Sequence, residues 1–158
     1  MSTAQRLIEQ LGLAPHPEGG WYRQIHRSAL TVQAPGGERA ALTTIYYLLE
    51  RDQVSRWHVV DADEAWHFYA GAPLELCIYY PRTQQLSRRE LGSPADGRDS
   101  VAVVAADAWQ AARSTGEYSL VGCTVGPGFE YSGFRFVSDL SDHRRHFEGV
   151  LHPLAHLL

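Results

Sequence analysis

Apolar and polar residues alternate in short runs along most of this sequence, which is the pattern of half-buried β-strands. The runs are rich in Val, Ile, Tyr, Phe and Trp, and Gly, Pro or Asp separates nearly all of them. They predict strands at residues 42–50, 54–60, 64–70, 74–80, 84–91, 101–104, 109–113, 118–125 and 129–137. Short strands at intervals of about 8–12 residues, without helical patterns between them, favour a β-sandwich or a small barrel. The chain is therefore predicted to be all-β.

The start of the chain departs from this strand pattern. Leu7, Ile8 and Leu11 share one face of a short helix predicted over residues 3–12. Residues 15–28 then predict a turn rich in Pro and Gly that leads into a further strand.

The remaining segments complete a single domain. Loops are predicted at residues 34–39 and 92–99, and neither has the character of a linker between domains. Beyond Asp139 the pattern becomes helical or irregular, and the leucines of the final LHPLAHLL are expected to pack on the barrel or on a neighbouring subunit. Of the 158 residues, 44% are apolar and 20% are charged, which suits one globular domain over residues 1–158.

The charge balance narrows the class of partner. The formal net charge is −4, so no positive field attracts the protein to nucleic acid or to an anionic membrane. The first residues lack a signal-peptide pattern, and no apolar run reaches the roughly 18 residues of a membrane-spanning helix. We therefore expect a cytoplasmic protein that binds a small molecule. Cys77 and Cys123 lie in apolar runs without metal-binding spacing, and both are expected to be buried, reduced thiols.

The segment SRWHVVDADEAWHFYAG carries the most concentrated chemistry of the chain. Arg56 and His58 lie on one face of its first predicted strand, and Glu64 begins the second strand after an acidic turn. If the two strands form a hairpin, His58 and Glu64 face each other across a barrel interior with Arg56 beside them. Charges on an inward face are costly unless they are paired or used. This segment is therefore the predicted ligand pocket.

Six ordered blocks of the sequence carry a family resemblance: HPEGGWYR, TTIYYLL, DADEAWHFYAG, LELCIYY, WQAAR and LVGCTVGPGFEY. Together they resemble the cupin family of uncharacterised function known as DUF985, over about residues 11–136. His58, Glu64 and Gly71 resemble the first motif of the cupin superfamily. The resemblance implies a cupin-type double-stranded β-helix, which is a jelly-roll barrel. It also implies a homodimer, because such barrels pair through sheet edges and N-terminal segments.

The same resemblance bears on metal binding. Of the four ligand positions of the superfamily, this sequence keeps His58 and Glu64, whereas Arg56 and Gln110 stand where histidines are expected. Arg56 would repel a cation, and a glutamine oxygen is a weak ligand for the transition metals that imidazole suits. A divalent metal held by His58, Glu64 and Gln110 is therefore disfavoured, and the cofactor stays open.

Three functions remain open. The first is an epimerase or isomerase with His58 as general base, Glu64 as its partner, Gln110 as a polar contact and Arg56 as the holder of an anionic group. This arrangement is similar in kind to that of the metal-free sugar-nucleotide epimerases, which share the barrel. The second is a non-catalytic module that senses or stores a small polar ligand. The third is a metal-dependent enzyme.

Further residues are expected to contact the ligand. Glu18, which precedes two glycines, is expected to reach the mouth of the barrel together with Tyr22 and Arg23. Trp66 and Phe68 share the face of Glu64 and are expected to form core or pocket wall.

Overall fold

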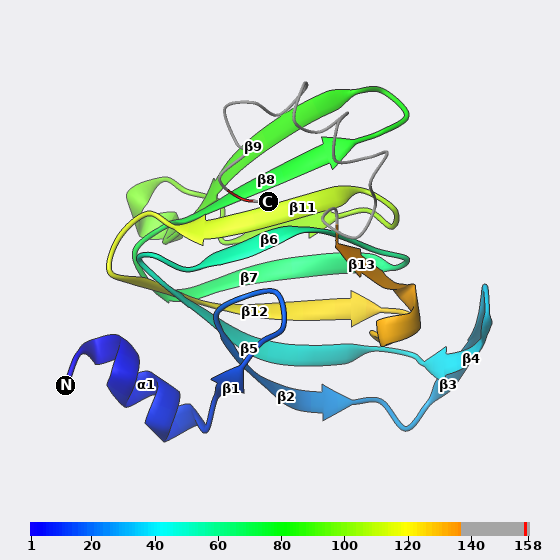
Figure 1. Cartoon of the computed structure of the whole chain (residues 1–158), viewed down its shortest axis with the longest axis horizontal. Helices are drawn as coiled ribbons and strands as arrows, with labels where there is room; N and C mark the ends of the chain where they lie inside the picture. Colours follow the sequence, from blue (N-terminus) through cyan, green and yellow to red (C-terminus); the bar gives the residue numbers. More distant parts are fainter. Residues whose placement is uncertain (137–156, 158) are drawn as a thin grey trace.

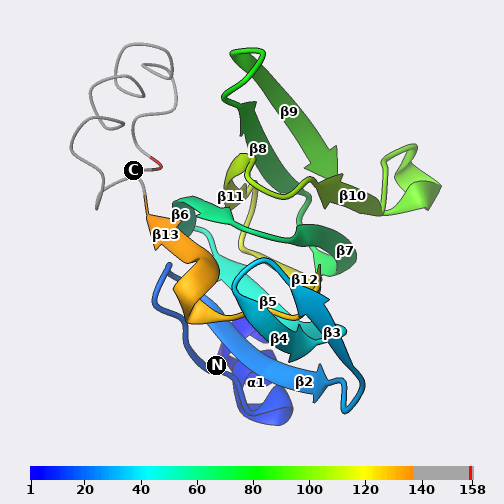
Figure 2. The same ribbon diagram turned by 90° about the vertical axis from the view of Figure 1, so that its right-hand side faces the viewer.

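The computed structural model describes residues 1–136 and residue 157, and antiparallel strands dominate this part of the chain (Figure 1). The six-stranded sheet has the order β1 (Ala14–Pro15), β2 (Trp21–Arg27), β5 (Thr43–Glu50), β12 (Tyr118–Gly126), β7 (Asp63–Gly71) and β10 (Val101–Val104). The five-stranded sheet has the order β13 (Phe134–Phe136), β6 (Val54–Val60), β11 (Trp109–Ser114), β8 (Leu74–Tyr80) and β9 (Gln85–Leu91). The inner faces of the two sheets share one apolar core, which is the arrangement of a jelly-roll barrel. In Figure 2, β8 and β9 of the five-stranded sheet lie above β2 and β5 of the six-stranded sheet.

The remaining elements are short. Helix α1 (Thr3–Leu11) begins at a capping box formed by Ser2 and Gln5, and its apolar residues pack on the outer face of the six-stranded sheet against Leu48 and Leu120. The two 3-10 turns are η1 (Pro94–Asp96) and η2 (Tyr131–Gly133). None of the helices in residues 1–136 is long and apolar enough to cross a membrane.

Most of the predicted strands are confirmed within one residue at each end, and two segments are corrected. Residues 34–39, predicted as a loop, belong to a two-stranded hairpin of β3 (Thr31–Ala34) and β4 (Gly37–Ala40). Residues 129–137 were expected to form one strand, but η2 interrupts them and only β13 pairs with β6. The predicted end of this strand at Val137 lies outside the described residues, as does the segment between Asp139 and His156.

The hairpin expected between residues 54–60 and 64–70 is wrong. β6 pairs with β11 and β13 in one sheet, whereas β7 pairs with β12 and β10 in the other. Asp61 and Ala62 connect them, and neither has the positive φ that two-residue hairpin turns favour. The backbone N–H of Asp61 instead donates to the Gly133 carbonyl, and its carboxylate accepts from Arg39. The chain therefore crosses from one sheet to the other, which places His58 and Glu64 on opposing walls of the barrel interior.

The barrel interior is divided into two halves. In one half the inward side chains of both sheets pack into a closed core that includes Tyr47, Trp66, Leu76 and Ile78. The other half lies where β5 and β7 begin and where β6 and β12 end. The side chains there do not fill the interior, and they line a cavity instead. Within the described residues, the candidate site therefore lies at this open end of the barrel.

Two smaller expectations concern the cysteines and the final leucines. Cys77 and Cys123 are both free and buried, as predicted. Leu157 is buried against Trp57 and Trp109, in a cluster that lies outside the barrel interior, so the last described leucine packs on the barrel. The homodimer stays a prediction.

Candidate functional site

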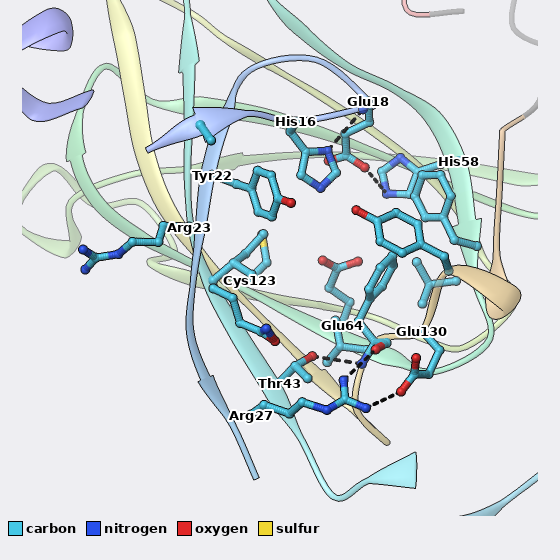
Figure 3. A pocket seen from close by; sticks show the side chains of 18 of the residues that line it. His16, Glu18, Tyr22, Arg23, Arg27, Thr43, His58, Glu64, Cys123 and Glu130 are labelled. Carbon is cyan, nitrogen blue, oxygen red and sulfur yellow. Dashed lines mark hydrogen bonds and ion pairs between the residues drawn. The ribbon is translucent and has the colours of Figure 1, made fainter. Parts of the chain in front are cut away.

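A cavity of about 400 Å³ opens at the unfilled end of the barrel (Figure 3). This volume is near the lower end of the range for small-molecule sites, which is about 300–1,000 Å³. Side chains of both sheets, the β1–β2 turn and the segment after β12 line it. The polar and titratable side chains in the lining are His16, Glu18, Tyr22, Arg23, Gln24, Arg27, Thr43, His58, Glu64, Cys123, Glu130 and Tyr131.

The β1–β2 turn carries Glu18 into this cavity, and two glycines make that possible. Gly19 has a φ of +109° and Gly20 a φ of +76°. A Cβ atom on Gly19 would lie 2.2 Å from the Val54 carbonyl oxygen, and one on Gly20 would lie 2.7 Å from the Leu48 carbonyl oxygen. Only glycine combines this backbone conformation with so close an approach to β5 and β6. The Glu-Gly-Gly run therefore presses Glu18 inward, where it is only 6% exposed.

Glu18 is held by two partners on β6. One carboxylate oxygen accepts a hydrogen bond of 2.9 Å from Ser55, and the other lies 3.4 Å from Nε2 of His58. Nδ1 of His58 lies 2.6 Å from the Arg56 carbonyl oxygen, which can only accept, so Nδ1 carries a hydrogen. The 2%-exposed imidazole also stacks on Phe134 at a ring distance of 5.2 Å. Both nitrogens of His58 are therefore engaged, and Glu18 and His58 act as one pair.

His16 lies beside the Glu18–His58 pair and differs from His58 in its contacts and its charge. Its Nδ1 accepts the backbone N–H of Glu18 at 3.1 Å, and its ring packs edge-on against Tyr22. Burial lowers the pKa of His16, and the neighbouring His58 lowers it further, against the opposing effect of Glu18. His16 is therefore neutral at pH 7.

Glu64 lies on the opposing wall, and a chain of two hydrogen bonds from Trp66 and Gln110 orients its carboxyl group. Trp66 donates its indole N–H to the Gln110 amide oxygen at 2.8 Å, and Gln110 donates its amide N–H to Glu64 at 2.5 Å. Because an indole can only donate, this chain fixes which end of the Gln110 amide faces Glu64. In Figure 3 the Glu64 carboxyl group lies at the centre of the ring of labelled side chains.

The environment of Glu64 shifts its protonation into the neutral range. Burial raises the pKa of Glu64 from 4.5 to about 7, and the charge of Glu18 raises it as well. The charge of His58 and the hydrogen bonds from Gln110 and Cys123 act in the opposite direction. At pH 7 Glu64 is therefore present both as acid and as carboxylate, which is the condition for moving protons in both directions.

The rim of the cavity is aromatic and is fixed to the six-stranded sheet. Phe129 donates its backbone N–H to Thr43, and Glu130 forms an ion pair with Arg27 of β2. The rings of Phe129, Tyr131 and Phe134 contact one another edge to face. Residues 129–134, the rim segment, therefore place an aromatic wall above the buried polar groups.

We expect Gln110→Met to be among the more damaging substitutions near the cavity. The variant leaves the buried Trp66 N–H and one Glu64 oxygen without their partner, which costs about 1–3 kcal/mol of unfolding free energy. It also removes a hydrogen bond that lowers the pKa of Glu64, so this carboxyl should titrate above pH 7. Urea unfolding and a carboxyl titration measure the two effects. Gln85→Met on the exposed strand β9 is the control and should change stability by less than about 0.5 kcal/mol.

Arg56 lies elsewhere than expected, and a β-bulge is the reason. Ser55 pairs with Ala112 and His58 with Gln110, so two residues of β6 lie opposite one of β11 and the alternation of faces is broken. The Arg56 guanidinium donates to the Pro17 carbonyl oxygen at 2.9 Å and lies 4.4 Å from the centre of the Phe136 ring. It does not line the cavity.

The other predicted site residues divide between the two halves of the barrel. His58, Glu64, Glu18 and Arg23 line the cavity, although Figure 3 shows the Arg23 side chain directed away from it. Gln110 lies behind Glu64. Trp66 and Phe68 share the inward face with Glu64 but pack in the closed half.

The four positions that the sequence resemblance relates to metal ligands do not fit a metal ion. Arg56 is directed away, Gln110 presents amide hydrogens rather than its oxygen, and both nitrogens of His58 are engaged. Within the described residues, no three His, Cys, Asp or Glu side chains form a group that could hold a metal ion. We therefore derive no chemistry through a metal.

Several lining residues were not predicted. His16, Arg27, Thr43 and Glu130 come from a Pro-flanked turn, two strand ends and a loop, where periodicity says little about which side chains point inward, and Cys123 lies within β12. The inward parity of Thr43 and Cys123 on their strands was the only available signal. The aromatic rim segment was missed because it was assigned to one continuous strand.

Known proteins resemble this chain in sequence and in structure. The family model described as "Cupin superfamily (DUF985)" matches residues 5–137. A hypothetical protein from Leishmania major is 32% identical, with a TM-score of 0.84 over 98% of this chain and 99% of its own. A protein from Shewanella oneidensis is 31% identical, with a TM-score of 0.82 over 100% of this chain and 98% of its own.

A more distant structure is similar in fold alone. A mutant of the oxalate decarboxylase of Bacillus subtilis is 13% identical, with a TM-score of 0.60 over 89% of this chain and 34% of its own. None of the curated proteins matches the sequence.

Proposed function

The chain belongs to the DUF985 family of the cupin superfamily, and we propose that it is an isomerase- or epimerase-type enzyme in which Glu64 moves a proton on a small polar substrate. The observation that carries this proposal is the buried carboxyl group of Glu64, which is 7% exposed, faces the cavity and has a pKa of about 7. Perturbed carboxyl groups in concave sites are typical of general acid–base catalysis.

Glu18 and Glu64, which lie on opposing walls of the cavity, have different roles in this proposal. The Glu18 carboxylate is bound by Ser55 and His58. The Glu18–His58 pair therefore orients the β1–β2 turn and supplies polar contacts, and it is not a free base. Glu64 has neutral hydrogen-bond donors behind it, Gln110 and Cys123, and no cationic partner in direct contact among the described residues. The base role, expected for His58 from the sequence, is therefore assigned to Glu64 in this proposal.

The proposed step is a balanced proton transfer. The Glu64 carboxylate takes the hydrogen of a carbon next to a carbonyl group, and the C–H electron pair moves into an enolate. The hydroxyl groups of Tyr22 and Thr43 line the same cavity and are available to donate to the enolate oxygen. Glu64 then returns the proton to the former carbonyl carbon, while the hydroxyl hydrogen on the neighbouring carbon moves to the former carbonyl oxygen through the Tyr22 or Thr43 hydroxyl, which gives an isomer. An epimer forms when the intermediate turns over in the cavity, so that Glu64 returns the proton to the opposite face of the original carbon.

The test is solvent exchange in deuterium oxide. We expect the protein to introduce deuterium next to the carbonyl group of at least one member of a panel of aldoses, ketoses and their acidic and phosphorylated derivatives, followed by NMR. Glu64→Gln keeps the shape of the side chain and removes the base, so the exchange rate should fall by about 10²–10⁴-fold. The matched control is Glu75→Gln, which makes the same change at a carboxylate that pairs with Arg113 outside the cavity.

Two outcomes would contradict the proposal. Equal exchange by the wild type and by Glu64→Gln would assign the chemistry to another group. Ligand binding without exchange across the whole panel would identify a non-catalytic binding module instead.

A further inference from the structure

The charged groups of the cavity are unevenly distributed with depth. The carboxyl, imidazole and guanidinium groups of the lining belong to His16, Glu18, Arg23, Arg27, His58, Glu64 and Glu130. Arg27 and Glu130 neutralise each other at the half-exposed rim. Arg23 is directed away from the cavity, and its guanidinium lies 5.9 Å from the centre of the Tyr46 ring. The two arginines therefore contribute no free positive charge to the interior.

The deeper groups supply no free cation either. His58 forms the pair with Glu18, and His16 is neutral because burial lowers its pKa. Glu18 and Glu64 are both more than nine-tenths buried. Within the described lining, an anionic group placed beside Glu64 would face the Glu18 and Glu64 carboxyl groups, and the one positive charge that acts on Glu64 there, that of His58, is already paired with Glu18. Burial in a medium of low dielectric strengthens that repulsion.

The hydrogen-bonding capacity of the interior is mixed rather than purely accepting. Thr43 accepts the Phe129 N–H and retains its own hydroxyl hydrogen, and the Gln24 amide both donates and accepts. Glu64 donates when protonated and accepts when ionised. An ammonium group needs acceptors only, whereas hydroxyl groups need both kinds of partner.

The aromatic rim and the volume of the cavity both suit a ligand with a hydroxylated ring. Aromatic faces such as those of the rim segment, residues 129–134, cover the apolar C–H face of a ring while its edge hydroxyls reach polar groups. A cavity of about 400 Å³ suits a ligand of one ring rather than a dinucleotide-sized molecule.

We propose that the cavity selects an uncharged, polyhydroxylated carbonyl compound of monosaccharide size, and that Glu18 and Glu64 exclude anionic sugars such as sugar phosphates and sugar acids. This inference rests on the proposed function for the reaction and names its substrate class. It departs from the anionic ligand that Arg56 suggested in the sequence, because Arg56 lies outside the cavity.

The test compares three probes that differ only at one carbon: D-glucose, D-glucuronate and 6-amino-6-deoxy-D-glucose. Binding is measured by calorimetry and by protein NMR at pH 5.5 and pH 8.0. We expect glucose to bind with less than about a threefold change between the two pH values, because its hydroxyls bond to either form of Glu64. Glucuronate should bind at least about tenfold more weakly than glucose at pH 8.0 and approach it at pH 5.5, where Glu64 is protonated.

Glu64→Gln is the matched variant, because it removes the charge at constant shape. In this variant the affinity for glucuronate should fall by less than about threefold between pH 5.5 and pH 8.0. The groups that face Glu64 and also influence the profile are His58, Glu18 and Cys123, and the variant leaves all three in place.

The outcomes separate this inference from the proposed function. Glucuronate binding as tightly as glucose at pH 8.0, the amino sugar binding more than about tenfold tighter than glucose, or no binding of any probe would each overturn the substrate class. Exchange of deuterium into a charged substrate would overturn the substrate class and leave the proton transfer intact. Glucose binding without deuterium exchange in any sugar would leave the substrate class intact and overturn the proton transfer.

Discussion

Glu64→Gln should make the protein more stable at alkaline pH and leave it nearly unchanged at acidic pH. The pKa of Glu64 is raised from 4.5 to about 7, so between these values the folded state binds a proton that the unfolded chain has released. The stability of the wild type therefore falls as the pH rises through this interval. The difference corresponds to roughly 3 kcal/mol above pH 7. Glutamine removes the buried charge and can still accept the hydrogen bond from Gln110.

Urea unfolding of both proteins between pH 4 and pH 8 measures this effect. Subtracting the two curves cancels titrations that both share, such as that of His16, whose lowered pKa makes stability rise with pH. The expected difference is close to zero at pH 4 and grows towards about 3 kcal/mol at pH 8. A difference that stays constant with pH would contradict the raised pKa of Glu64.

Gly19→Ala should be the most damaging single-methyl substitution in the β1–β2 turn. The new Cβ would lie 2.2 Å from the Val54 carbonyl oxygen at a φ of +109°, so strain and overlap add to a loss of about 3 kcal/mol or more. The turn would also move away from Tyr47, which donates to the Gly19 carbonyl, and Glu18 would leave its position against His58.

Gly36→Ala is the control for this variant. Gly36 also has a positive φ, of +94°, but no heavy atom lies within 4 Å of its ideal Cβ position. Its cost should be limited to the backbone strain of about 1–2 kcal/mol. Equal losses for the two variants in urea unfolding at pH 7 would show that the close packing of the Glu-Gly-Gly turn on β6 does not matter.

The strands could be predicted because their apolar alternation is local information. β6, β8 and β10 have the predicted bounds, because each is a short, mainly apolar run that Asp or Pro residues border on both sides. β3 and β4 were missed because both have only four residues, β3 has no buried residue, and the buried half of β4 begins with a charged arginine. Arg39 on β4 is buried through contacts with Gly128 and Asp61, which lie far away in the sequence.

The candidate site was predicted in part, for the same reason. The inward faces of His58 and Glu64 followed from periodicity, and both line the cavity. The choice between a hairpin and a crossing between sheets depends on pairing partners, which periodicity does not contain. The outward turn of Arg56 depends on a bulge opposite Ala111, and the engagement of both His58 nitrogens depends on the distant Glu18. These tertiary contacts decide the roles of the residues.

The most direct test of the central claim is the titration of the Glu64 carboxyl carbon by NMR in the wild-type protein, assigned by its absence in Glu64→Gln. The account predicts an inflection near pH 7, because burial and the neighbouring Glu18 favour the protonated form. An inflection near the ordinary value of 4.5 would show that Glu64 is a permanent carboxylate at neutral pH, and would contradict its role as the acid and base of this cavity.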